Sequence, residues 1–302
     1  MSETQGIIPS DRAADAHGAY RPLHAGSTIL VPAIPVSHND EQYSSGGHQR
    51  LFQMQAAHFW YRGRHRFLMH AVRKWALRDI PEDKNPCIID LGGGCGGWVK
   101  YLSDRTPWPN AELALSDSSV QALELAKPML SPRITLYQTD LMNLQWNDRW
   151  DITFALDVIE HLPEPVAALK QIYAATKPGG LAFITVPALQ SFWSYIDELA
   201  NHQKRYCSSD FGPLADETGF EIVDIRYFMF FLSPLVYFSR IASGPKSKDL
   251  EVLRKEQEKH HEIPRLIVNR SLSAIFCAET PIGHWIKFPW GTSLLCVMKK
   301  PG

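Results

Sequence analysis

Short apolar runs alternate with helical patterns over residues 87–186. The runs typical of buried strands are Cys87–Leu91, Glu112–Ser116, Ile134–Gln138, Ile152–Leu156 and Leu181–Val186. Segments with helical spacing of apolar residues lie between them, over Trp98–Leu102, Val120–Lys127 and Glu164–Thr176. This alternation predicts βαβ units with right-handed crossovers, and therefore an α/β fold around a mostly parallel sheet.

The pattern continues on both sides of this region. Between Gln49 and Leu77, apolar and aromatic residues recur at helical spacing without a proline, which predicts one or two helices before the first strand. Phe220–Arg226 and Thr292–Met298 predict two closing strands. The sequence thus divides into a core at 46–227, a helical insertion at 228–290 and a closing strand at 291–302.

Residues 1–45 lack this periodicity. They mix Pro, Gly, Ser, His and Asp, a composition that predicts a flexible N-terminal arm. One apolar segment of the arm, Ile29–Val36, is a candidate for docking on the core. Its two prolines argue against a central strand, because proline cannot donate a ladder hydrogen bond.

Composition narrows the class of protein. The 302 residues carry 31 Lys and Arg against 32 Asp and Glu, and the formal net charge of −1 argues against a bulk electrostatic binder of nucleic acid. Five cysteines without a CxxC pair favour a reducing cytoplasm over a disulfide framework. The N-terminus lacks the apolar region of a signal peptide. The longest strongly apolar stretch, Phe228–Phe238, is far shorter than the roughly 20 residues that cross a bilayer. We therefore expect a cytoplasmic protein.

A glycine-rich turn follows the first strand of the core and opens a helix. Glycines let the backbone turn tightly and approach a ligand at the helix N-terminus. Gly92, Gly94 and Gly97 match the G-x-G-x-x-G dinucleotide fingerprint. The same first two glycines with Gly96 and Asp90 match D-x-G-x-G-x-G instead. Asp90 favours the second interpretation, because a carboxylate suits the ammonium and sulfonium of S-adenosylmethionine better than a pyrophosphate.

Acidic residues end the next two predicted strands. Asp117 lies where a carboxylate can accept hydrogen bonds from the ribose hydroxyls of a bound nucleoside. Asp140 follows the third strand, where a carboxylate can accept a hydrogen bond from the adenine amine. The alternatives are a helix cap for Asp117 and a turn cap for Asp140.

Taken together, these segments resemble the class I S-adenosylmethionine-dependent methyltransferases. The resemblance covers roughly residues 50–227 and rejoins at 292–299. It rests on the glycine turn, on residues 115–118 and 122–126, on Thr139–Asp140, on residues 155–165 and on Lys177–Gly180. It implies a Rossmann-like, seven-stranded sheet flanked by helices, with its last strand antiparallel and the helical insertion before that strand.

The resemblance also implies a set of cofactor contacts. The glycine turn would hold the amino-acid part of S-adenosylmethionine. An arginine on the preceding helix would pair with the cofactor carboxylate, with Arg66 as the first choice and Arg62 and Arg64 as rivals. The predicted cofactor-binding residues are Arg66, Asp90, Gly92, Gly94, Gly96, Asp117, Ser118, Asp140, Leu141 and Asp157.

Candidate catalytic residues follow the fourth and fifth strands. A hydroxyl acceptor gains from a general base, and His161 lies at the carboxyl edge of the sheet, where ligands bind. Its alternatives are a structural role in the loop and a Mg²⁺ site with Asp157 and Glu160, which resembles a segment of ubiquinone-type O-methyltransferases. We do not include a metal in the predicted site. His202 and Tyr206 follow the fifth strand, either over the substrate or in a surface turn.

The leading hypothesis is methyl transfer to a small acceptor, with oxygen as the expected acceptor atom. His58–Arg62 and His202–Tyr206 resemble a bacterial-type group of small-molecule methyltransferases that accompany glycan, lipid or secondary-metabolite pathways. The alternatives are a nicotinamide-dependent oxidoreductase and a non-catalytic cofactor-binding protein. A nucleic-acid methyltransferase is disfavoured, because no Asn-Pro-Pro-Tyr type segment follows the fourth strand.

The insertion leaves three interpretations open. Its aromatic segment, residues 228–238, is typical of a packed helical cap, of a lid over an apolar acceptor, or of a contact with a membrane surface or lipid. The mixed charges at 246–261 predict a solvated helix.

Overall fold

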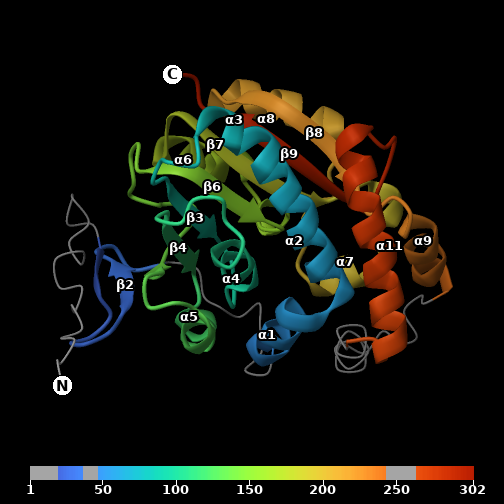
Figure 1. Cartoon of the computed structure of the whole chain (residues 1–302), viewed down its shortest axis with the longest axis horizontal. Helices are drawn as coiled ribbons and strands as arrows, with labels where there is room; N and C mark the ends of the chain where they lie inside the picture. The colour runs from blue at the N-terminus through green and yellow to red at the C-terminus, as the bar shows by residue number, and fades with distance from the viewer. Residues whose placement is uncertain (1–19, 37–46, 243–262) are drawn as a thin grey trace.

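The computed structural model describes residues 20–36, 47–242 and 263–302. A nine-stranded sheet runs through the centre of the molecule, and helices cover its faces (Figure 1). The strand order across the sheet is β1-β2-β5-β4-β3-β6-β7-β9-β8. The fold class is therefore α/β, as the sequence predicts.

Seven of these strands form the predicted core. They are β3 (Cys87–Leu91), β4 (Glu112–Asp117), β5 (Thr135–Gln138), β6 (Trp150–Leu156), β7 (Thr176–Pro187), β8 (Glu221–Phe228) and β9 (Ser293–Lys299). The strands from β3 to β7 pair in parallel, whereas β9 runs antiparallel between β7 and β8. The predicted seven-stranded Rossmann-like sheet with an antiparallel last strand is confirmed. Because β3–β7 are parallel, their carboxyl ends meet at one edge, the place where open α/β sheets bind ligands.

The N-terminal segment adds two strands to this core. β1 (Tyr20–Pro22) pairs antiparallel with β2 (Ile29–Pro32), and β2 extends the sheet parallel to β5. The predicted flexible arm over residues 1–45 is therefore wrong for these residues. Burial of Ile29 and Tyr20 supplies the apolar contact that holds the segment on the sheet. The proline at the end of β2 occupies no interior position of the strand, so it does not prevent the pairing.

Most of the predicted helices form. The helices before the first core strand are α1 (Gly47–Ala57) and α2 (Phe59–Ala71), and α2 continues through a π-helical turn (Val72–Ala76) into α3 (Leu77–Asp79). The crossover helices are α4 (Gly97–Ser103), α5 (Val120–Ala126) and α6 (Pro165–Ala175). Further along the chain lie α7 (Tyr195–Leu199) and α8 (Phe211–Thr218). Each βαβ unit of the core thus has the helix that its apolar spacing predicts.

The insertion contains two described helices, α9 (Ser233–Ala242) and α11 (Leu266–Trp285). The helix α11 packs along α2 (Figure 1). The charged segment 246–261, for which a solvated helix is predicted, lies outside the described residues. Within the described ranges, we find no helix that is both long enough and apolar enough to cross a membrane.

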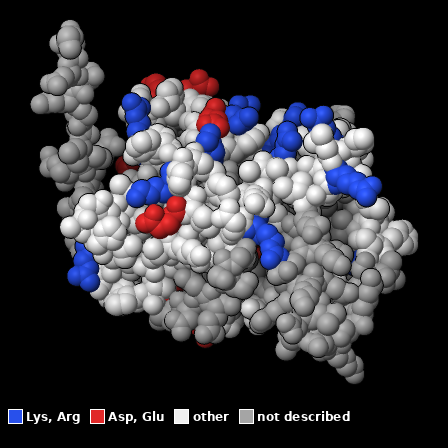
Figure 2. Space-filling model, turned by 90° about the horizontal axis from the view of Figure 1, so that it is seen from below, with Lys and Arg blue, Asp and Glu red and all other residues white. Residues whose placement is uncertain are grey.

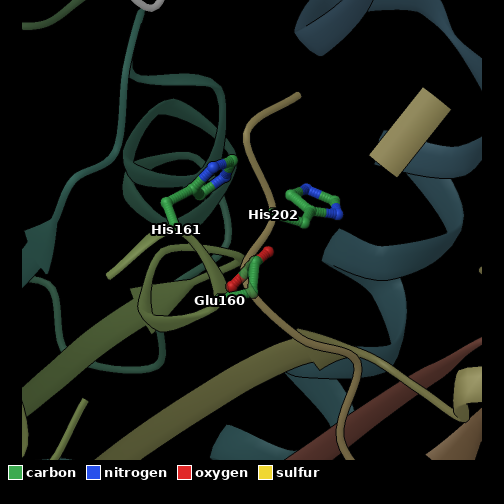
Figure 3. A group of neighbouring side chains, drawn as sticks. All are labelled: Glu160, His161 and His202. Carbon is green, nitrogen blue, oxygen red and sulfur yellow. The ribbon is translucent and has the colours of Figure 1, made fainter. Parts of the chain in front are cut away.

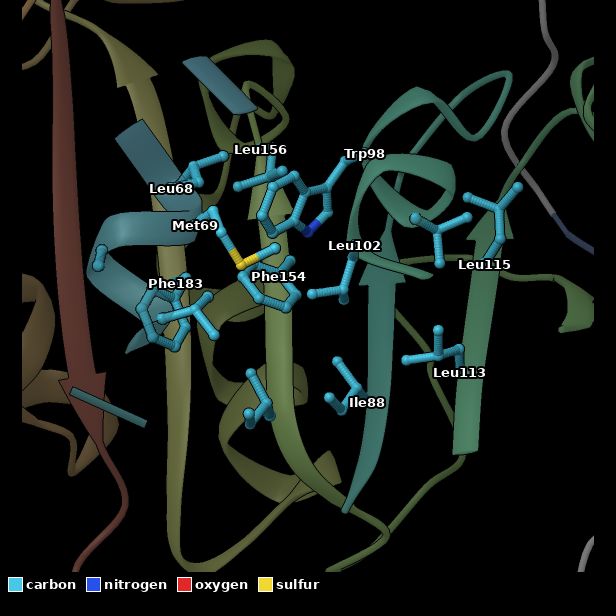
Figure 4. Packing of buried hydrophobic residues seen from close by; sticks show 14 of the residues in the cluster. Leu68, Met69, Ile88, Trp98, Leu102, Leu113, Leu115, Phe154, Leu156 and Phe183 are labelled. Carbon is cyan, nitrogen blue, oxygen red and sulfur yellow. The ribbon is translucent and has the colours of Figure 1, made fainter. Parts of the chain in front are cut away.

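Two apolar layers hold the sheet between its helices. Along β3, Ile88 faces the layer under α2 and α4, whereas Ile89 faces the layer under α6 and α8. In the first layer, the Phe154 ring packs between Trp98 and Phe183, with ring centroids 5.1 Å apart in each pair (Figure 4). Each fully buried side chain of this kind stabilises the fold by roughly 1.5–3 kcal/mol. This packing fixes the strand ends that carry the site.

Candidate functional site

The glycine turn between β3 and α4 has backbone φ angles that residues with side chains rarely adopt. Gly92, Gly94 and Gly96 have φ angles of +67°, +58° and +77°. Gly93 has no room either, because a Cβ there would lie 2.4 Å from Oδ2 of Asp90. The turn therefore requires its glycines, and it leaves the backbone close to any ligand at the N-terminus of α4.

Asp90 lies buried beneath this turn. Neither carboxylate oxygen accepts a hydrogen bond within the part of the chain that the structure describes. Burial raises the pKa of Asp90 to about 7, although the positive charge of Arg64 opposes the rise. A buried carboxylate without a donor fits a cationic group of a ligand, such as the ammonium of S-adenosylmethionine.

Asp117 ties the glycine turn to the end of β4. Its Oδ2 accepts a hydrogen bond from the Gly94 amide at 2.8 Å, and its Oδ1 accepts one from the Ser119 amide at 2.9 Å. Ser119, rather than Asp117, is the N-cap of α5, because its hydroxyl accepts from the Ala122 amide. Asp117 is therefore not the helix cap, and its place at the strand end is the one predicted for ribose binding. A carboxylate has about four lone-pair sites, so these two amide contacts leave capacity for ribose hydroxyls.

The strand ends of β4 and β5 bring the adenine-side residues together. Asp117 and Gln138 are register partners, and Nε2 of Gln138 donates to the carbonyl of Ser118 at 2.9 Å. Asp140 follows directly, and its Oδ1 accepts from the Met142 amide at 2.9 Å. This turn contact is the predicted alternative role of Asp140, and it orients the carboxylate beside Leu141. The adenine roles of Ser118, Asp140 and Leu141 remain predictions.

The arginine nearest the site differs from the first choice made from the sequence. Arg66 is exposed, whereas Arg64 is buried and donates a hydrogen bond to Oδ2 of Asp157. Two positions along a helix correspond to a rotation of about 200°, so Arg64 and Arg66 face opposite sides of α2. Asp157 also accepts a hydrogen bond from the Thr185 hydroxyl at 3.1 Å. Because Arg64 pairs with it, the negative charge of Asp157 is balanced at this edge of the sheet. The cofactor contact of Arg66 stays a prediction, and the structure places Arg64, not Arg66, at this edge of the sheet.

A second group of side chains lies after β6 and β7. Glu160, His161 and His202 converge (Figure 3), and one ligand atom of each lies within 4.8 Å of the others. Oε2 of Glu160 and Nδ1 of His161 are buried and lack a hydrogen-bond partner among the described residues. Burial, and then the charge of Asp157, raise the pKa of Glu160 well above its usual range. Burial and the neighbouring His202 lower the pKa of His161 to about 4, so the imidazole is neutral at physiological pH.

Asp197 orients His202 within this group. Oδ1 of Asp197 lies 2.9 Å from Nδ1 of His202 and 2.8 Å from Nε of Arg205. Its Oδ2 accepts from Arg240 of α9 at 3.0 Å. Burial alone would raise the pKa of Asp197, but the His202 hydrogen bond and the Arg205 charge hold it well below its usual range. An ionised Asp197 fixes the ring of His202 with Nδ1 as the donor, which leaves Nε2 as an acceptor.

Tyr206 is buried in the core. Its hydroxyl donates to the carbonyl of Ile159 at 3.4 Å. Burial, and then the charge of Glu160, raise the pKa of Tyr206, which makes proton loss harder. This contact joins the segment after β7 to the loop that carries Glu160 and His161, and the catalytic role of Tyr206 stays a prediction. Its position in sequence, four residues after His202, gave no sign of this burial.

Glu160, His161 and His202 could hold a divalent metal ion. The set considered from the sequence was Asp157, Glu160 and His161. Asp157 is engaged by Arg64, and His202 takes its place beside Glu160 and His161. Sequence reasoning missed Asp197, which orients His202. A signal was available, because Asp197 lies five residues before His202 on a short helix, but its burial was not predictable.

Fold and site together define a class I S-adenosylmethionine-dependent methyltransferase. The family model described as "Methyltransferase domain" matches residues 57–225, which is more than half of the chain. The chain belongs to this family, and its cofactor is S-adenosylmethionine. The two interpretations of the glycine turn are thereby resolved, and the nicotinamide alternative is not supported.

Two curated relatives each match less than half of this chain. Trans-aconitate 2-methyltransferase of Azoarcus sp. (strain BH72) is 32% identical over 111 residues, which cover 37% of this chain and 43% of the relative. Phosphoethanolamine N-methyltransferase 2 of Caenorhabditis elegans is 28% identical over 141 residues, covering 44% of this chain and 32% of the relative. The chain thus spans less than half the length of these two relatives.

Solved structures confirm the fold. Phosphoethanolamine N-methyltransferase 2 of Haemonchus contortus, in complex with S-adenosyl-L-methionine, superposes with a TM-score of 0.54 at 15% identity, covering 87% of this chain and 59% of that chain. The CurJ carbon methyltransferase superposes with a TM-score of 0.51 at 12% identity, covering 78% of this chain and 54% of that chain. Proteins named for nitrogen and for carbon methylation thus share this fold, so the fold alone does not define the acceptor atom.

Proposed function

We propose that this protein transfers the methyl group of S-adenosylmethionine to a hydroxyl oxygen of a small, apolar acceptor, with His202 as the general base. The observation that carries the proposal is the Asp197–His202 pair at the carboxyl edge of the sheet, beside Glu160 and His161. A hydroxyl is a weak nucleophile until a base accepts its proton, so a histidine held by a carboxylate suits a hydroxyl acceptor. The trans-aconitate and phosphoethanolamine relatives support a small molecule as the acceptor.

The residues of this chain would align the acceptor and move one proton. Bound S-adenosylmethionine supplies an electrophilic methyl group on a positively charged sulfur. Asp197 accepts from Nδ1–H of His202, and Nε2 of His202 then takes the hydroxyl proton as the acceptor oxygen bonds to the methyl carbon. The bond between methyl carbon and sulfur would break with its electron pair on sulfur, so the products would be the methyl ether, neutral sulfide and protonated His202.

Glu160 and His161 have supporting roles in this proposal. With its pKa near 4, His161 is a weak base, so it serves better as a neutral hydrogen-bonding group beside His202 than as the proton acceptor. Buried Glu160 stays protonated up to a higher pH than an ordinary carboxyl, and it can donate a hydrogen bond to the acceptor. Arg64, with a buried Nε that has no partner among the described atoms, is our candidate for the cofactor carboxylate in place of Arg66.

The apolar character of the acceptor rests on the side chains beside this group. The Phe192 ring lies 5.8 Å from Tyr237 of α9, and Arg240 donates to the carbonyl of Phe192. Just before α9, the Phe230 ring stacks on the Phe288 ring, and the two ring centroids are 4.6 Å apart. The insertion therefore meets the segment that carries Asp197 through aromatic rings, which suits an apolar acceptor better than a highly charged one.

An isotope experiment tests the proposal. The protein is incubated with S-adenosylmethionine carrying a deuterated methyl group and with fractionated extract of the native host, and labelled products are identified by mass spectrometry. We expect a labelled methyl ether that disappears with His202→Gln. A labelled product with the methyl group on nitrogen or carbon, or one formed equally well by His202→Gln, would contradict the proposal.

A further inference from the structure

The long helix α11 has its polar face inside and its apolar face outside. The buried side chains of α11 include Asn269, Ser273, Glu279, Thr280 and His284. The side chains of Ile267 and Trp285 are exposed by 80% and 88% at opposite ends of the helix, and Ile275 and Ile282 are exposed between them. A helix on the surface of a water-soluble domain has the reverse pattern.

The buried polar groups of α11 are used by the fold. Asn269 accepts from the Phe59 amide at 2.8 Å and donates to the Ala57 carbonyl at 2.9 Å, at the junction of α1 and α2. His284 makes a 2.9 Å hydrogen bond with the Phe67 carbonyl, and Glu279 accepts from the Phe231 amide at 2.8 Å. These contacts fix which face of α11 turns inward. The outward apolar face is therefore a property of the native packing.

The neighbouring helix α9 extends the apolar surface. Leu235 and Phe238 are exposed by 57% and 67%, and Phe231 just before the helix is also exposed. In Figure 1, α9 and α11 both lie toward the same end of the molecule. We call the exposed apolar side chains of α9 and α11 the outer apolar surface. Large exposed apolar surfaces mark interaction sites, because water-exposed apolar area costs about 25 cal/mol per Å².

Charge around the outer apolar surface points to one kind of occupant. Arg265, Arg270 and Lys287 are exposed at its ends and along α11. Over the described residues 230–240 and 263–290, the single acidic residue is Glu279, which is buried. Seen from below, the half of the molecule toward α9 and α11 carries more Lys and Arg than Asp and Glu (Figure 2). Two copies of this chain would place like charges together, whereas an anionic lipid surface would neutralise them.

We propose that the outer apolar surface docks on an anionic membrane, with α11 lying in the plane of the lipid headgroups. Exposed Trp285, Trp290 and Tyr237 have the amphipathic rings that favour this interfacial layer. A helix with apolar side chains on one face and arginines beside them binds such an interface without crossing the bilayer. In this proposal most of the membrane contact is made by α11, whereas the sequence indicated only residues 228–238.

Docking would also place the catalytic group near the lipid. Arg240, on the same helix as Leu235 and Phe238, reaches inward to Asp197, which orients His202. This helix is thus joined to the proposed base through the Arg240–Asp197 ion pair and the Asp197–His202 hydrogen bond. This consequence rests on the function proposed above, and it indicates an acceptor that partitions into membranes.

Vesicle sedimentation tests the docking without any knowledge of the acceptor. The full chain is mixed with vesicles of phosphatidylcholine alone, or of phosphatidylcholine with phosphatidylglycerol. We expect binding to the anionic vesicles that weakens with salt, and at least about tenfold weaker binding for the double variant Ile267→Ser/Trp285→Ser. Arg265→Gln/Arg270→Gln should remove most of the preference for anionic lipid. The control Ile34→Ser alters another exposed isoleucine, at 58% compared with 80% for Ile267, on the N-terminal segment and should leave binding unchanged.

Three outcomes would overturn the docking proposal. They are no binding of the unaltered chain to anionic vesicles, equal binding of Ile267→Ser/Trp285→Ser, and a dimer of the chain that this variant disrupts. Unchanged thermal unfolding and S-adenosylhomocysteine affinity show that the variants are folded. Failure of docking leaves the His202 chemistry standing, and loss of the His202 role leaves vesicle binding unchanged, so the two proposals fail separately.

Discussion

The cofactor half and the acceptor half of this site are built in different ways. In the cofactor half, Asp90, Asp117 and Asp140 each follow or end a strand, and neighbouring parallel strands bring them to one edge. In the acceptor half, Asp197 and Arg240 come from elements 43 residues apart, and they meet only through tertiary packing. The difference teaches that a common cofactor is recognised by local backbone geometry. The proposed acceptor side depends instead on contacts between segments distant in sequence.

Arg64 connects the two halves. It pairs with Asp157, and its charge opposes the raised pKa of both Asp90 and Glu160. One buried cation thus acts on a carboxyl of each half. Its position on α2, which also packs against α11, links the site to the outer apolar surface.

The largest expected effect is at His202, where a substitution should change turnover but not cofactor binding. His202→Gln should lower turnover of the labelled acceptor by about 10²-fold or more while leaving S-adenosylhomocysteine affinity unchanged, because a general base contributes about 10²–10⁴-fold. Steady-state kinetics and calorimetry measure the two effects. His24→Gln, an exposed histidine in the N-terminal segment, is the control. Undiminished turnover in His202→Gln would remove this residue from the chemistry.

The converse change affects the cofactor half. Asp117→Ala should weaken S-adenosylhomocysteine binding by about 100-fold, because it removes an acceptor for ribose and releases the Gly94 amide from its 2.8 Å contact. Asp104→Ala, which breaks surface ion pairs with Lys100 and Arg105, should change the affinity little. Calorimetry on both variants decides the matter, and equal affinities would contradict the role of Asp117.

Substitution of two glycines, Gly93 in the cofactor turn and Gly63 at the contact of α2 with α11, compares the two regions by their effect on stability. In Gly93→Ala the new Cβ would lie 2.4 Å from Asp90, and in Gly63→Ala it would lie 2.0 Å from the Phe276 ring of α11. Each should lower the free energy of unfolding by roughly 1–3 kcal/mol. Only Gly93→Ala should also weaken S-adenosylhomocysteine binding. Denaturant titration gives the stabilities, with Gly212→Ala as a control, because a Cβ there meets no atom within 4 Å.

The smallest effect concerns pH and Asp90. Its pKa of about 7 lies above the ordinary 3.8, so the folded state holds a proton that the unfolded state releases near pH 4. This contribution to the free energy of unfolding therefore falls as pH rises from about 4 to 7, and is level above that range. Ligand ammonium pairs with the ionised form, so affinity should rise about tenfold from pH 6 to pH 8. Calorimetry at these pH values should show the rise, and Asp90→Asn should abolish it; a flat profile in the unaltered protein would contradict the pairing.

The sequence alone determined the seven core strands, their helices and the glycine turn with acidic residues at the strand ends beside it. Apolar spacing reports burial within an element, and glycines with acidic residues at strand ends report local backbone geometry, so both are readable without long-range contacts. The same reasoning did not show that Arg64 is buried and Arg66 exposed, because helix pattern does not show which side meets the sheet until the helix has docked.

Only the tertiary structure decided the rest. It paired β2 with β5, buried Tyr206, brought Asp197 to His202 and turned the apolar face of α11 outward. Each of these outcomes depends on contacts between residues distant in sequence. Asn269 and His284, for example, are buried because the backbone of α1 and α2 offers them hydrogen bonds. Polar residues inside and apolar residues outside reverse the usual pattern, and hydrogen-bond partners more than 200 positions away supply the physical reason.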